Sequence, residues 1–295
     1  MKWSDRPLSR VRDVGGLVVV ALVLRAASSR GADDSLVVGV SVPPQAYLLE
    51  RIGGERVEVL VMVPPGASPA TYEPTPQQLV ELGRASLYVK VGHPDFLFER
   101  RHLATLVKVN PEIPILDMAA TMEGLCQGER STELDGDPHL WLSPRLMRAA
   151  AAGIEDALLV LDPAGAPFYR RNLQALLVDI DRLDLEIGEL MAGLQGRRFM
   201  VFHPAWSYFA CDYGLRQMAI EAGGKEPSPA QLVATIQAAR RAGIGVIFVQ
   251  RGFSDRSARV IAAEIGARIE ALDPMAHDWL ENLRTSAERI AAAVR

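Results

Sequence analysis

Three side chains of this sequence have the chemistry of metal ligands: His139, His203 and Asp273. Imidazole nitrogens and carboxylate oxygens together suit zinc, manganese or ferrous iron. His203 directly follows the apolar run 199–202, and Asp273 directly follows the run 267–272, so both are expected where a strand ends. Taken singly, such residues are more often part of a turn than ligands. The metal hypothesis therefore depends on the elements that carry them.

Those elements alternate between short strands and helices along the chain. Runs that predict strands lie at 36–42, 57–63, 87–91, 199–202, 217–220, 246–250 and 267–272. Helical spacing separates them, as in 46–52 and after Thr75-Pro76. This alternation predicts parallel sheets covered on both faces, with ligands bound beyond the carboxyl ends of the strands.

One long helix is predicted between the two groups of strands. Apolar residues recur about every 3.5 positions from 163 to 194, and no proline interrupts them after Pro167. The predicted fold is therefore α/β: an N-terminal lobe over 29–162, a linking helix over 163–195 and a C-terminal lobe over 196–295, with mainly parallel sheets. In this arrangement each lobe contributes one imidazole.

His139 is predicted to precede a helix of the first lobe. It lies in Asp137-Pro138-His139-Leu140-Trp141, just ahead of Ser143-Pro144, a pair typical of an N-cap and a first helical residue. Like His203, His139 is expected where a strand gives way to a helix. The two imidazoles would then face the same region from different lobes.

Residues 1–28 predict a cleaved signal peptide. Four basic side chains precede the apolar run 14–24, which is too short to span a bilayer comfortably. No cysteine lies directly after this run, where a lipid would be attached, so we expect a freely diffusing periplasmic protein rather than a lipid-anchored one. The net charge of −4 disfavours nucleic acid as a partner.

Several separate motifs resemble the cluster A-I solute-binding proteins of ABC transporters, the ZnuA and TroA type, along nearly all of the mature chain. They are Val63-Pro64-Pro65-Gly66-Ala67-Ser68-Pro69, Thr71-Tyr72-Glu73-Pro74, Asp137-Pro138-His139-Leu140-Trp141, Phe202-His203-Pro204-Ala205-Trp206 and Glu226-Pro227-Ser228-Pro229. The resemblance implies a rigid helix joining the lobes and a metal held between them by His139, His203 and Asp273. It also implies a monomer that delivers the metal to a membrane permease driven by a cytoplasmic ATPase.

One departure from the family pattern concerns the ligands. The family normally has a histidine directly after the Ser-Pro of the first motif, where this chain has Ala70. His93 follows the predicted strand 87–91 and is a candidate replacement; Glu73 or water are alternatives. Gln250, where relatives often carry glutamate, is expected to orient an imidazole.

Zinc is the expected cargo, because two or three imidazoles with one carboxylate favour it, and manganese or iron is the alternative. A zinc-dependent hydrolase is the rival class, but neither a His-Glu-x-x-His run nor a Gly-x-Ser-x-Gly elbow occurs. His102 and His277 are expected to be solvated. Whether Cys126 and Cys211 form a disulfide stays open, because nothing local brings them together.

Overall fold

The computed structural model describes residues 35–122, 134, 136–221, 225–250 and 256–295. The predicted signal peptide and Cys126 lie outside these residues. Within them, Cys211 is half-buried. No helix in the described part of the chain is both long and apolar enough to cross a membrane.

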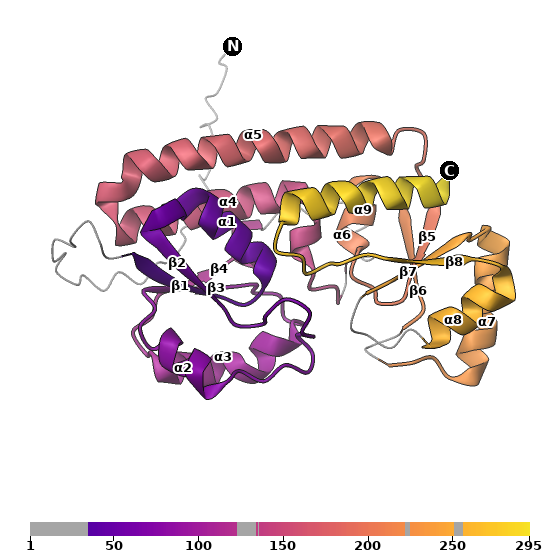
Figure 1. The fold of residues 1–295 in the computed structure, drawn as a ribbon, viewed down its shortest axis with the longest axis horizontal. Helices are drawn as coiled ribbons and strands as arrows, with labels where there is room; N and C mark the ends of the chain where they lie inside the picture. The colour runs from indigo at the N-terminus through magenta and orange to yellow at the C-terminus, as the bar shows by residue number, and fades with distance from the viewer. Residues whose placement is uncertain (1–34, 123–133, 135, 222–224, 251–255) are drawn as a thin grey trace, which may run out of the picture.

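Two four-stranded parallel sheets form the two lobes (Figure 1). The first has the order β2-β1-β3-β4 and consists of β1 (Leu36–Val40), β2 (Val57–Val61), β3 (Leu87–Lys90) and β4 (Ile115–Asp117). The second has the order β6-β5-β7-β8 and consists of β5 (Arg198–Val201), β6 (Arg216–Ala219), β7 (Val246–Val249) and β8 (Arg268–Ala271). The predicted α/β class with parallel sheets is confirmed.

Nine α-helices of the described residues cover these sheets. They are α1 (Pro43–Gly53), α2 (Pro76–Leu82), α3 (Leu97–Val109), α4 (Pro144–Leu161), α5 (Ala166–Leu190), α6 (Ser207–Asp212), α7 (Pro229–Ala242), α8 (Arg256–Ile265) and α9 (Trp279–Val294). Proline begins several of them, where its missing N–H costs nothing. The Ser143 hydroxyl caps α4 by accepting the N–H of Leu146, as the sequence predicts.

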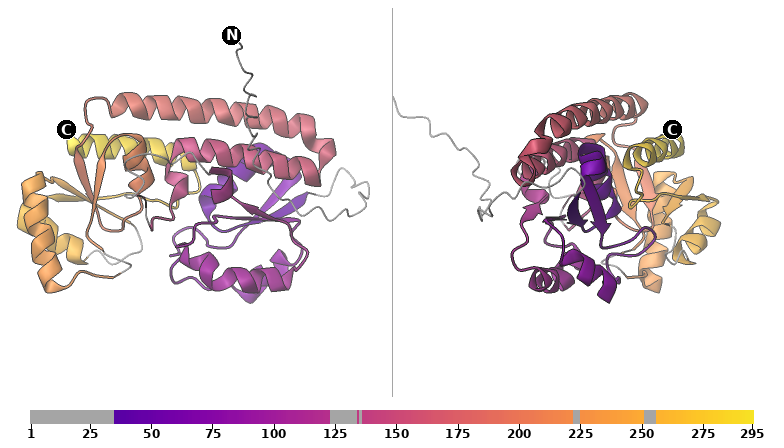
Figure 2. Two further views of the ribbon diagram at one scale, coloured as in Figure 1. Left: turned by 180° about the vertical axis from the view of Figure 1, so that it is seen from behind. Right: turned by 60° about the vertical axis from the view of Figure 1, so that its left-hand side comes forward.

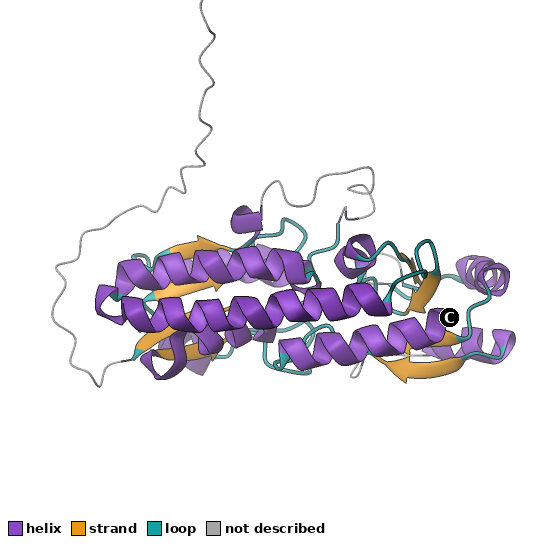
Figure 3. Ribbon diagram, turned by 90° about the horizontal axis from the view of Figure 1, so that it is seen from above, coloured by secondary structure: helices purple, strands orange, loops and turns teal. Residues whose placement is uncertain are grey.

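The predicted long helix is α5, which runs along both lobes (Figures 1 and 2). It is shorter than 163–194, because Pro163–Gly165 form a 3₁₀ turn and the α-helix ends at Leu190. Its buried stripe is Tyr169, Leu173, Leu176, Ile180, Leu183 and Ile187. Seen from above, α4, α5 and α9 lie side by side as one layer of helices (Figure 3). This layer joins the lobes.

The lobes also meet through buried indole groups. The Trp141 side chain donates Nε1–H to the Pro274 carbonyl at 2.6 Å, and Trp279 donates Nε1–H to the Trp141 carbonyl at 2.6 Å. Both indoles are almost completely buried. At the surface, His277 and Glu50 add an exposed ion pair at 3.0 Å. His277 therefore has an acidic partner in the other lobe.

Asp212 forms another link, since the Ser143 hydroxyl donates to it at 2.6 Å. Burial raises the pKa of Asp212 to about 6; it outweighs the hydrogen bond from Ser143 and the attraction of Arg145, and Asp184 adds repulsion. The folded protein thus holds this proton more tightly than the unfolded chain does. That stabilisation is complete below about pH 4 and is lost as pH rises through about 6.

Replacing Asp212 by asparagine should remove this loss, because the amide oxygen still accepts from Ser143 but does not titrate. We expect the free energy of unfolding, measured by urea denaturation, to fall less between about pH 4 and 7 in Asp212→Asn than in the wild type. Asp181→Asn, at an exposed ion pair, is the control and should keep the wild-type slope. An unchanged slope in Asp212→Asn contradicts this prediction.

Candidate metal site

His139 is held by a carboxylate two residues before it. Its Nδ1 lies 2.6 Å from Asp137 Oδ1, and its backbone N–H donates to the same oxygen at 2.9 Å. Burial favours the neutral acid, but the attraction and hydrogen bonds of His139, with a contribution from Ser207, lower the pKa of Asp137 in sum. The ionised carboxylate accepts Nδ1–H, so the lone pair of the neutral imidazole is at Nε2.

The loop before His139 differs from the prediction. Among the described residues, a turn and not a strand lies directly before His139. The 3₁₀ turn Leu140–Leu142 follows it, before α4. The expectation that a strand gives way to a helix here is wrong. Trp141 stabilises this turn, because its buried ring packs against the ring of His139, with 5.2 Å between the ring centroids.

His203 has the same arrangement in the second lobe. It lies two residues after β5, and its Nδ1 is 3.1 Å from Oε1 of Glu221, a buried carboxylate two residues after β6. Imidazoles that bind metals commonly donate their other N–H to a carboxylate, which fixes the ring and strengthens it as a ligand. Glu221 is thus a functional candidate that the sequence prediction missed.

The structure brings the two predicted imidazoles together. The ring centroids of His139 and His203 are 5.2 Å apart, with the rings inclined at 79°. His139 is 7% exposed and the His203 side chain 27%, so the pair lies at a junction between the lobes that is buried on the His139 side and partly open on the His203 side. Two imidazoles of this kind, each with a carboxylate on Nδ1, have the chemistry to hold a transition-metal ion.

Asp273 and Gln250 follow neighbouring strands, β8 and β7, at the same edge as His203. A cavity of about 10 Å³, room for one water, is lined by His203, Gln250 and the two neighbours of Asp273, Leu272 and Pro274. Asp273 itself is exposed, and its Oδ1 accepts the N–H of Met275 at 2.9 Å. The Gln250 carboxamide oxygen is buried without a hydrogen-bond partner.

His93 lies close enough to the first imidazole to interact with its charge. Burial lowers the pKa of His93; Asp95 and Asp137 oppose this effect and His139 adds to it. Its Nδ1, however, accepts the backbone N–H of Asp95 at 3.1 Å. The proton of neutral His93 is therefore at Nε2, so binding a metal there requires the other tautomer and the loss of this hydrogen bond.

Local contacts fix the loop that carries His93. Gly92 has φ 83°, and a Cβ there would meet the Asp117 carboxylate at 1.8 Å, so only glycine fits. Glu99 of α3 accepts the N–H groups of Val91 and Gly92 at 2.6 and 2.9 Å. His93 is therefore carried by a rigid strand end.

Glu73 and Ala70 belong to a segment that packs on α3. Glu73 is exposed and lies 3.6 Å from Nε2 of His102, while Arg101 donates to the Ala70 carbonyl. The expectation that His102 is solvated is wrong, because its side chain is only 13% exposed and packs against Phe98. Glu73 thus contacts His102, and not His139 or His203, among the described residues.

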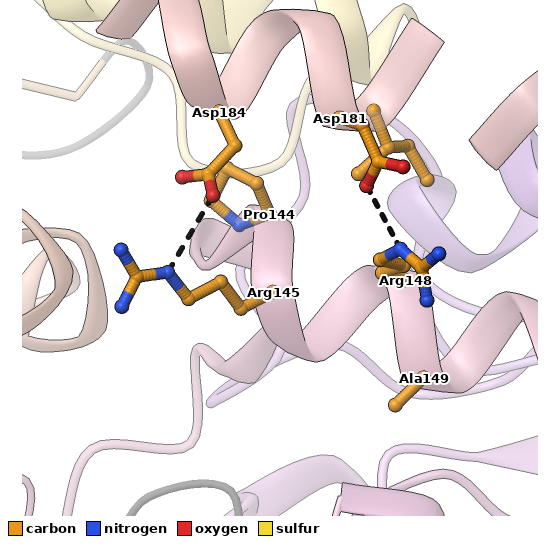
Figure 4. Close-up of a pocket in the computed structure, with 7 residues that line it drawn as sticks. Pro144, Arg145, Arg148, Ala149, Asp181 and Asp184 are labelled. Atoms are coloured by element: carbon orange, nitrogen blue, oxygen red, sulfur yellow. Dashed lines mark hydrogen bonds and ion pairs between the residues drawn. The ribbon is translucent and has the colours of Figure 1, made fainter. Parts of the chain in front are cut away.

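Among the described residues, no three His, Cys, Asp or Glu side chains converge closely enough to hold a metal ion together. The larger pocket, about 280 Å³ between α4 and α5, contains none of the predicted ligands (Figure 4). Its charges are paired, Arg145 with Asp184 at 3.5 Å and Arg148 with Asp181 at 2.8 Å. The paired imidazoles of His139 and His203 lie instead at the lobe junction, where a bare ion needs little volume.

Two parallel-sheet lobes, a helical layer joining them and paired imidazoles at their junction define a class: the two-lobed binding proteins that carry metal ions. The model of the family "Zinc-uptake complex component A periplasmic", ZnuA, matches residues 38–293. The chain belongs to this family and is a metal-binding solute-binding protein. The resemblance read from the motifs is confirmed.

Solved structures support the same assignment. A crystal structure of ZnuA has 42% identity and a TM-score of 0.81, covering 89% of this chain and 100% of that one. A ZnuA deletion mutant with zinc bound has 42% identity and a TM-score of 0.79, covering 88% of this chain and 98% of that one.

Relatives named for different metals also match. They are the high-affinity zinc uptake system protein ZnuA of Bacillus subtilis (26% identity, 84% of this chain, 81% of the relative), the manganese-binding lipoprotein MntA of Halalkalibacterium halodurans (27%, 79%, 79%) and the iron-binding protein YfeA of Yersinia pestis (28%, 75%, 71%). The family assignment thus covers metal binding but not the choice of metal.

Proposed function

We propose that this protein captures zinc outside the cytoplasm and delivers it to the permease of an ABC importer, which a cytoplasmic ATPase drives. The observation that carries this proposal is the His139–His203 pair, with ring centroids 5.2 Å apart and a carboxylate on each Nδ1. Imidazole-rich sites favour zinc over manganese, which prefers oxygen ligands. The predicted signal peptide, 1–28, would export the chain, and we expect the exported protein to act as a monomer.

His139, His203 and Asp273 are the proposed ligands, one from the first lobe and two from the second. Asp273 would have to move to join the two imidazoles, because no three ligand side chains converge among the described residues and its Oδ1 now accepts the N–H of Met275. A fourth position would fall to water, to His93 after a change of tautomer, or to Glu73. Of these we favour water, since His93 would lose its bond from Asp95 and Glu73 is paired with His102.

The test is a titration of metal-stripped mature protein with zinc and manganese, with metal content measured by mass spectrometry. We expect one tightly bound zinc and weaker manganese. In His93→Ala, zinc affinity should change by less than the roughly 10–100-fold typical of losing a group that supports a ligand. A larger loss would make His93 a ligand, and a wild-type protein that takes no metal would overturn the proposal.

Manganese or iron cargo is the second candidate, favoured by the relatives that carry those names and by Ala70, which removes an imidazole from the family pattern. Tighter binding of manganese than of zinc in the same titration would establish manganese as the cargo. A hydrolase has no comparable support, because the matching family and the relatives reported above are named for metal uptake and metal binding.

A further inference from the structure

Both carboxylate oxygens of Asp137 accept hydrogen bonds. Oδ1 accepts the backbone N–H and the Nδ1–H of His139, and Oδ2 accepts the backbone N–H of Ser207 at 3.1 Å. Ser207 is the first residue of α6, in the second lobe. The Asp137 side chain is only 5% exposed, so water does not compete strongly for these bonds.

The segment that carries His139 is attached to the second lobe at further points. Trp141 donates to Pro274 and accepts from Trp279, and Ser143 donates to Asp212. Although this segment belongs to the first lobe by sequence, its hydrogen bonds run to α6, to Pro274 after β8 and to the first residue of α9. His139 is thereby held against the lobe that carries His203.

We propose that Asp137 is a positioning residue that sets the orientation and tautomer of His139 and fixes both to the second lobe through Ser207. This inference rests on the proposed function, because it assumes that His139 binds the metal. One carboxylate oxygen keeps the proton of the imidazole on Nδ1, so Nε2 presents its lone pair. The other oxygen fixes where that lone pair points relative to His203.

The opposing view is that Asp137 only stabilises the fold, as a buried capping carboxylate would. The two roles differ in how they depend on His139. A positioning residue acts on the metal through the imidazole, so its effect on affinity vanishes when the imidazole is absent. A stabilising residue changes unfolding in the same way whether or not His139 is present.

The experiment uses the mature protein with Asp137→Asn, His139→Ala and the double variant. We expect zinc affinity in Asp137→Asn to fall by roughly 10–100-fold, the loss typical of removing a ligand's carboxylate partner. In the His139→Ala background, adding Asp137→Asn should change the residual affinity by less than about 2-fold. Asp181→Asn, which removes the same charge at an exposed pair, should match the wild type.

A spectroscopic readout separates positioning from general destabilisation. Cobalt bound in place of zinc absorbs visible light in bands that depend on ligand geometry, so Asp137→Asn should shift these bands and Asp181→Asn should not. Unchanged affinity and bands in Asp137→Asn, with a wild type that binds zinc, overturn this inference alone. A wild type that binds neither zinc nor cobalt overturns the proposed function instead.

Discussion

Replacing His203 by alanine is expected to abolish tight zinc binding. The substitution removes one of the two imidazoles that meet at the lobe junction and leaves the buried Glu221 carboxylate without its partner. The affinity loss should exceed the roughly 10–100-fold attributed to a ligand's supporting group, because a metal–nitrogen bond itself is lost. Competition with a zinc chelator of known affinity measures it.

His277→Ala is the matched control for this experiment. His277 is also an imidazole next to a glutamate, Glu50, but the pair is nearly half exposed and lies at the surface. Such a pair contributes little to stability, and its loss should leave zinc affinity unchanged. If His203→Ala binds zinc as tightly as His277→Ala does, the junction of the lobes is not the metal site.

The second large effect is expected on stability, in Trp279→Ala. Trp279 is 1% exposed, packs against Tyr47 of the first lobe and donates Nε1–H to the Trp141 carbonyl. Truncating a buried tryptophan costs about 3–5 kcal/mol through lost burial and the cavity it leaves. Urea denaturation of the metal-free protein should show this as a lower free energy of unfolding.

Two further variants separate the contribution of the indole hydrogen bond from that of the buried ring and provide a surface control. Trp279→Phe keeps most of the ring but leaves the Trp141 carbonyl without its donor, so we expect a smaller loss of about 1–3 kcal/mol. Leu185→Ala, at a position of α5 that is 63% exposed, should stay within about 0.5 kcal/mol of the wild type. Equal stability of Trp279→Ala and Leu185→Ala would mean that the indole contacts do not hold the lobes together.

The fold could be predicted because its signals are local. Short apolar runs that end at polar residues mark the strands, and the 3.5-residue spacing marks α5, so the places of His203 and Asp273 after strands follow directly. The strand β4 was not predicted, because it has only three residues.

The site could be predicted only in part, because its decisive contacts join distant residues. The hydrogen bond between Asp137 and Ser207 joins residues 70 positions apart, and that between Glu221 and His203 joins residues 18 apart. No periodicity of the sequence reveals such contacts. Glu221 did have a local signal, since it directly follows the strand 217–220, as His203 follows its own. The burial of His102 depends on Phe98 and the segment of Glu73, and helix composition alone could not show it.

The layer of α4, α5 and α9 has a consequence for how quickly cargo leaves. The helix α5 runs along both lobes and packs against α4 and α9, so this layer resists the wide hinge opening that frees a ligand in many two-lobed receptors. The residence time of a bound metal should then depend on the breaking of individual coordination bonds. Its off-rate is therefore expected to rise with the concentration of a small competing chelator, as in associative ligand exchange, instead of reaching a plateau set by domain motion.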